Sequence, residues 1–216
     1  RENPWVETAL AVMQNIVAHV TKPTDQIILM VAHNPGYIGL DNMSYLIEKD
    51  AAWKPYSKAI ITFMNSWFVS WYMYRFCYSK AIRTMRFDNY HLAKCRVPLK
   101  MVQSLGAKLD KENTKKLKGE IEDLIKKVGS QKVQDPFMVK FSPKLKAHPL
   151  ITLNILGSLQ ENSPSNMAID FLVDSFVLEL FDLSKWREAL KDQYAMKSHS
   201  GLLDVEEEDD QMVGSA

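Results

Sequence analysis

The stretch Ala59–Tyr74, AIITFMNSWFVSWYMY, contains no charged residue and is bounded by Lys58 and Arg75. Its sixteen residues are fewer than the roughly 20 that a membrane-spanning helix needs. At helical spacing, the large apolar side chains of this region form one stripe: Ile60, Met64, Trp67, Trp71, Tyr74 and Tyr78. A helix that is apolar over most of its circumference is typical of a protein core. We therefore expect a long central core helix over residues 57–87 and no association with a membrane.

Helical periodicity extends to both sides of this stretch. Apolar spacing and capping residues predict further helices over 4–20, 41–49 and 111–128, and after Ser163 and Ser184. The apolar run over 27–31 is compatible with either a buried strand or a short helix. Glycine is scarce, at 8 of 216 residues, which disfavours glycine-rich phosphate loops and turn-dense β-sandwiches. The sequence therefore predicts an all-α fold class with a compact helical domain.

Prolines and charge runs suggest how the chain is divided. Residues 130–149 contain three helix-breaking prolines and predict an extended linker or arm. Five consecutive acidic residues over 206–210 repel one another and predict a disordered C-terminal tail. The expected parts are an N-terminal helical lobe over 1–129, the arm over 130–149, a helical segment over 150–198 and the acidic tail over 199–216. The helices form either one compact unit or two lobes joined near the arm.

The formal net charge of +1 hides an uneven distribution of charge. Residues 1–73 carry a net charge of −1, residues 74–147 of +11 and residues 148–216 of −9. Such asymmetry indicates an anionic partner or an acidic segment with a role of its own. Asp170 and Asp174, four residues apart in the acidic part, are interpreted as a solvated helix face.

The positive charge is concentrated in a short stretch rich in aromatic residues. Seven basic residues, termed the basic belt, lie within it: Arg75, Lys80, Arg83, Arg86, Lys94, Arg96 and Lys100. Tyr78, Phe87 and Tyr90 are interleaved with them, and Asp88 is the one acidic residue of the stretch. Lysine and arginine neutralise phosphates, and unpaired bases stack on aromatic rings. This combination predicts a nucleic-acid-binding site in which the three aromatic residues stack on bases.

Enzymatic chemistry is not expected. The sequence contains no hydrolase elbow, no phosphate-binding loop and no dinucleotide fingerprint. His91, Cys95 and Cys77 lack the paired spacing of a zinc site, so we expect two core cysteines and neither a metal nor a cofactor. Two cysteines are too few for a disulfide framework in a chain of this length, which favours a reducing, cytoplasmic environment.

These observations predict a single-stranded RNA-binding protein that assembles with other copies of itself. A helical core, a basic belt, an extended arm and an acidic tail together resemble the general plan of RNA-virus nucleoproteins, although no motif carries this likeness. The alternative is a non-enzymatic helical adaptor whose basic belt binds an acidic protein. Two interpretations of the acidic tail stay open: it occupies the basic belt of its own chain or of a neighbouring copy, or it only increases solubility.

Overall fold

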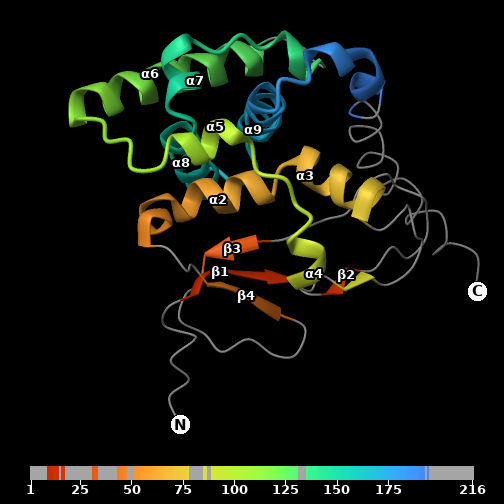
Figure 1. Ribbon diagram of the computed structural model, residues 1–216. Coiled ribbons are helices and arrows are strands. Elements are labelled where there is room, and N and C mark those ends of the chain that lie inside the picture. Colours follow the sequence, from red (N-terminus) through yellow and green to blue (C-terminus); the bar gives the residue numbers. More distant parts are fainter. Residues whose placement is uncertain are drawn as a thin grey trace, which may run out of the picture.

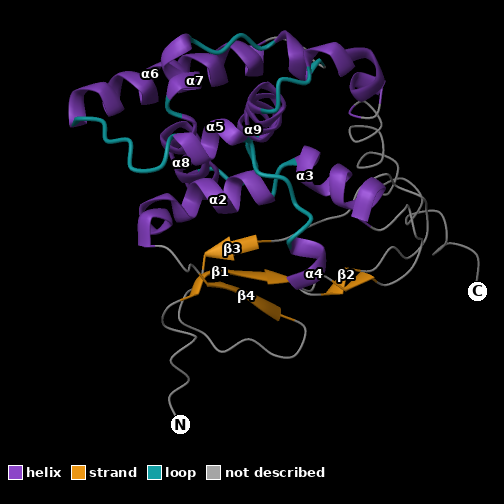
Figure 2. Ribbon diagram, viewed as in Figure 1, coloured by secondary structure: helices purple, strands orange, loops and turns teal. Residues whose placement is uncertain are grey.

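The protein is mostly helical, as the sequence predicts, with a small sheet packed on one side of the helices (Figures 1 and 2). In this computed structural model the described residues are 9–14, 16–17, 31–33, 43–47, 51–77, 85–86, 89–130, 135–192 and 194. The α-helices are α2 (Ser57–Met64), α3 (Trp67–Tyr72), α4 (Asn89–Leu92), α5 (Leu99–Gln103), α6 (Lys111–Ser130), α7 (Pro143–Ala147), α8 (Pro149–Asn162) and α9 (Met167–Leu180). The elements η1 (Ala51–Tyr56), η3 (Pro136–Met138) and η4 (Ser184–Trp186) are tighter, 3-10 helical turns. The element η2 (Met73–Cys77) is a wider, π-helical turn.

The main departure from the sequence prediction is an antiparallel sheet near the N-terminus. Its central strand β1 (Ala9–Gln14) pairs with β3 (Val31–His33) on one side and with β4 (Met43–Ile47) on the other. Two shorter strands, β2 (Ile16–Val17) and β5 (Met85–Arg86), form a separate antiparallel pair. The prediction of helices over 4–20 and 41–49 is therefore wrong where β1, β2 and β4 lie. For the run over 27–31, the described residue Val31 lies in a strand, as one of the two interpretations expects.

The physical reason for this departure lies in the apolar run of β1. Alternate residues Ala11 and Met13 are fully buried, which is the period of a strand. The same run also contains residues at helical spacing, so periodicity alone does not separate the two structures. Pairing with β3 and β4, which are distant in sequence, decides in favour of the strand. The sheet then packs against α2 through β1 and β3.

The expected continuous helix over 57–87 is broken between α2 and α3. Ser66 takes an extended conformation, and its hydroxyl donates a hydrogen bond to the Phe63 carbonyl, 2.7 Å away. The backbone N–H of Trp67 then donates to Oδ1 of Asp174 over 2.7 Å. This buried carboxylate caps the new helix, so the predicted solvated face at Asp174 is wrong. The described helix ends in the wide turn η2 at Cys77.

Asp174 also ties the last described residue to the core. The hydroxyl of Tyr194 donates to Oδ2 of Asp174 over 3.1 Å. The Tyr194 ring meets Trp67 edge-on at 5.1 Å between ring centroids and Phe171 at 6.0 Å. Burial raises the pKa of Tyr194, and the Asp174 charge adds to the rise. One buried carboxylate thus joins α3, α9 and the end of the described chain.

The predicted extended arm over 130–149 is instead packed onto the helices from Asp135 onward. Pro136, Phe141 and Leu145 are buried, and the turn η3 and the helix α7 lie within this range. Proline does not break these turns because Pro136 and Pro143 stand at the first position of η3 and α7, where a backbone N–H has no partner to lose. Asp135 and Ser142 cap the two turns. Residues 131–134 lie outside the described residues.

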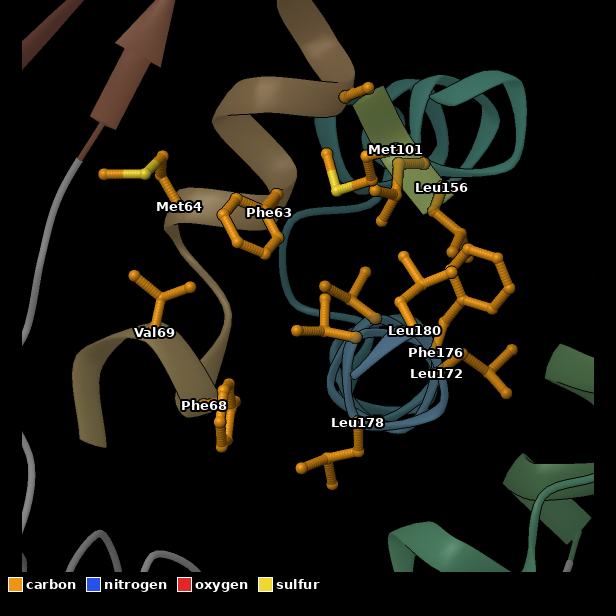
Figure 3. Close-up of a cluster of buried hydrophobic side chains, with 14 of the residues drawn as sticks. Phe63, Met64, Phe68, Val69, Met101, Leu156, Leu172, Phe176, Leu178 and Leu180 are labelled. Carbon is orange, nitrogen blue, oxygen red and sulfur yellow. The ribbon is translucent and has the colours of Figure 1, made fainter. Parts of the chain in front are cut away.

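The core lies between α2, α8 and α9 (Figure 3). Phe63, Met101 and Leu156 gather around the α9 side chains Leu172 and Phe176 in this view. The close packing of α2 on α8 requires Gly157, since a Cβ there would overlap the Thr62 hydroxyl. One buried cluster contains side chains from both sides of 130–149. The division of the chain into lobes stays a prediction.

The later helices follow the sequence prediction closely. The helix expected over 111–128 is α6, and Asp110 caps it by accepting the Asn113 N–H over 2.7 Å. The helix expected after Ser163 is α9, where the Asn166 side chain provides the cap. The acidic tail over 199–216 lies outside the described residues.

Candidate nucleic-acid interface

The structure describes the side chains of half of the ten predicted site residues. These are Arg75, Tyr90, Lys94, Arg96 and Lys100. Arg86 lies in β5, where only its backbone is described. The predictions at Lys80, Arg83, Tyr78 and Phe87 fall outside the described residues. The candidate interface is therefore built here from the two ends of the basic belt.

The first end is the wide turn η2, which follows α3 directly. The Arg75 guanidinium carbon lies 5.7 Å from the centre of the Trp71 ring, within reach of a cation–π contact. Phe76 is 62% exposed and meets Trp71 edge-on, with 5.7 Å between ring centroids. The aromatic cluster of the core thus continues to the surface at this turn. There, Trp71 contacts both the Arg75 guanidinium and the exposed ring of Phe76.

The second end begins with the short helix α4. Tyr90 is 67% exposed, and the Lys94 ammonium lies 3.9 Å from the centre of its ring. His91 packs edge-on against Tyr90 at 5.4 Å between ring centroids. An exposed aromatic ring with an ammonium held over it offers both groups that a single-stranded nucleic acid uses: a surface for a base and a charge for its phosphate.

The chain then runs through an exposed segment into α5. Arg96 and Lys100 are exposed, as a phosphate-binding role requires. Pro98 and Met101 are buried and hold the segment on the body of the protein, where α5 contacts α8. Next to these anchors, large apolar side chains also face outward: Val97, Leu99 and Val102. The sequence prediction did not include these three residues, although their spacing around the two cations is visible in the sequence.

The two ends of the basic belt lie next to each other. Burial raises the pKa of the Cys77 thiol in η2, and the charge of Lys94, from the other end of the belt, lowers it by a smaller amount. Burial is the larger effect on both thiols and raises the pKa of Cys95 to about 12. Both cysteines are therefore protonated thiols at neutral pH. The Cys77 thiol also lies 3.4 Å from the Met73 sulfur.

A small pocket opens between α3 and the segment before α5. Its volume is about 180 Å³, and its walls are apolar. The lining residues come from α3, from the segment before α5 and from the end of α9: Phe68, Val69, Tyr72, Cys95, Arg96 and Phe181. No sequence pattern predicts this pocket, because three segments distant in sequence form it. Phe76 is the other surface group that sequence reasoning left out of the site, and its place directly after Arg75 is a signal for it.

Neither a metal-binding cluster nor a membrane-spanning helix is found in the part of the chain that the structure describes. No group of three or more His, Cys, Asp or Glu side chains there could hold a metal ion. No helix among the described residues is long and apolar enough to cross a membrane.

Comparison with known proteins gives no independent indication of function. The sequence matches no protein-family model, and neither a curated protein nor a solved structure matches it. The functional argument therefore rests on the chemistry of the site itself.

Proposed function

We propose that this protein binds single-stranded RNA along the basic belt and assembles with other copies of itself on the RNA. The observation that carries the proposal is the exposed Tyr90 ring with the Lys94 ammonium at 3.9 Å from its centre. Arg96 and Lys100 follow within ten residues and are also exposed. Bases of a single strand stack on such rings, and phosphates release counterions to such cations.

A titration of fluorescein-labelled oligouridine with the purified protein tests this proposal by fluorescence anisotropy. Tyr90→Ala removes the ring and should weaken binding about 5- to 100-fold, since stacking contributes about 1–3 kcal/mol per base. Tyr90→Phe keeps the ring and should bind like the unchanged protein. Equal affinity of the alanine and phenylalanine variants would show that Tyr90 does not stack on RNA.

The alternative function is an adaptor that binds an acidic protein. The exposed apolar side chains Val97, Leu99 and Val102 favour it, because protein interfaces combine apolar contacts with charge. An adaptor should purify with a protein-like ratio of absorbance at 260 and 280 nm and should bind oligouridine weakly. An RNA-binding protein should purify with bound RNA, and size-exclusion chromatography with light scattering should show assemblies that ribonuclease dissolves.

A further inference from the structure

The apolar pocket beside Arg96 has the size and chemistry of a receptor for a side chain. Its volume of about 180 Å³ is enough for a group of about the size of benzene, which occupies apolar cavities of about 150 Å³ in proteins. Arg96 lines it, and Lys94 and Lys100 lie two and four residues away in the chain. The occupant that fits is an aliphatic side chain followed by acidic residues.

A nucleobase fits this pocket less well. The edges of a base carry hydrogen-bond donors and acceptors, and an apolar wall leaves them without partners, at a cost of about 1–3 kcal/mol each. An aliphatic side chain has no such groups. The pocket and the stacking surface at Tyr90 are therefore suited to different ligands.

The chain itself contains a segment with the required pattern. Residues 202–210 read LLDVEEEDD, in which two leucines and a valine are followed by five consecutive acidic residues. Nowhere else in the sequence do five acidic residues stand together. The apolar residues of this segment thus match the apolar pocket, and its acidic run matches the positive charge around Arg96.

The position of Tyr194 places this segment within reach of the pocket. The Tyr194 ring packs on Trp67, and the next residue of α3, Phe68, lines the pocket. Seven residues connect Tyr194 to Leu202, and an extended chain of that length spans about 25 Å. Such a short connection gives the attached segment an effective concentration in the millimolar range. Binding within one chain is therefore favoured over binding between two copies.

We propose that residues 202–210 bind this surface of their own chain, with one leucine of the Leu202–Leu203 pair in the apolar pocket and the acidic run against Arg96, Lys94 and Lys100. The segment then occupies three cations of the basic belt. If the proposed function is correct, RNA must displace it, and weak polyanions are excluded. The intramolecular contact itself does not depend on RNA.

Competition with a labelled peptide tests this contact in the 216-residue chain. A fluorescein-labelled peptide of residues 200–212 is titrated with the unchanged protein and with the variant Leu202→Ala/Leu203→Ala, in the absence of nucleic acid. The variant should bind the peptide at least about tenfold more tightly, because its own segment no longer competes for the surface. Both substituted positions lie outside the buried core of the described residues, so the measurement is separate from folding.

Charge exchange identifies the surface. Adding Arg96→Glu to the leucine variant should weaken peptide binding at least about tenfold, and a peptide with Glu206→Lys and Glu207→Lys should recover it. Lys115→Glu, a charge reversal at an exposed position of α6, serves as the matched control and should leave the affinity unchanged.

Equal peptide affinity of the unchanged and leucine-substituted proteins overturns the proposal, and so does insensitivity to Arg96→Glu. A dimer that becomes a monomer in the leucine variant, as measured by light scattering, also overturns it, because the segment then binds a second copy. Since the titration contains no nucleic acid, failure to bind RNA leaves its result unchanged.

Discussion

Replacement of Asp174 by alanine is expected to destabilise the protein by about 2–6 kcal/mol. The substitution leaves two buried donors without this acceptor: the Trp67 backbone N–H, now 2.7 Å from Oδ1, and the Tyr194 hydroxyl, 3.1 Å from Oδ2. Each unpaired buried donor costs about 1–3 kcal/mol. The sum lies at the upper end of single-substitution effects, as expected for a broken buried network.

Urea unfolding followed by tryptophan fluorescence measures this loss. Asp174→Asn keeps one carbonyl acceptor and should cost about half as much as Asp174→Ala. Tyr194→Phe removes one donor, and its cost should shrink when combined with Asp174→Ala, because both substitutions remove the same hydrogen bond. A loss below about 1 kcal/mol for Asp174→Ala, with an unchanged urea slope, would contradict the capping role of this carboxylate.

Three further predictions concern packing and ionisation. Gly157→Ala forces a Cβ against Thr62 and should lower the free energy of unfolding, measured by thermal denaturation, by about 1–2 kcal/mol. At Gly119 a Cβ meets no atom within 4 Å, so Gly119→Ala should raise that free energy by up to about 1 kcal/mol. Cys95, with a pKa raised to about 12, should react with iodoacetamide at pH 8 at least about a hundredfold more slowly in the folded than in the urea-unfolded protein, as mass spectrometry of timed samples can show. Burial raises the pKa of the Tyr194 hydroxyl above that of the unfolded chain, so this hydroxyl stabilises the fold fully below pH 10 and loses that contribution at higher pH. The urea midpoint between pH 9 and 11 should therefore fall less steeply in Tyr194→Phe than in the unchanged protein.

The helices that are predicted best are those whose signals are local. For α6 and α9, a capping residue, an apolar stripe and a following break lie within a single segment, and the structure confirms them. The stretch Ala59–Tyr74 was correctly assigned to helices of the core, but its break at Ser66 depends on Asp174, more than a hundred residues later. No periodicity in the stretch itself contains that information.

The N-terminal strands illustrate the opposite limit. The run around Ala11 and Met13 satisfies both a helical and a strand pattern, and pairing with two distant segments decides between them. The prediction of an extended arm over 130–149 is wrong from Asp135 onward, because prolines are excluded from the interior of a helix but not from its first turn. Pro136 and Pro143 occupy such first turns.

The candidate site was partly predictable because some of its residues are neighbours in sequence. The exposed Tyr90 and the half-buried Lys94 belong to one short segment, so their spacing predicts that they act together. The apolar pocket beside Arg96 combines α3, the segment before α5 and the end of α9, and only the folded chain brings these together. Sequence reasoning therefore identified the charged part of the surface and missed its apolar part.

The salt dependence of oligouridine binding tests the central claim most directly. The logarithm of the binding constant, plotted against the logarithm of the salt concentration, should fall with a slope of about −0.7 for each phosphate neutralised on a single strand. In Lys94→Ala/Arg96→Ala/Lys100→Ala the slope should become shallower by about 2, whereas Lys115→Ala, at an exposed position of α6, should leave it unchanged. An identical slope in the triple variant and the unchanged protein would contradict RNA binding at this surface.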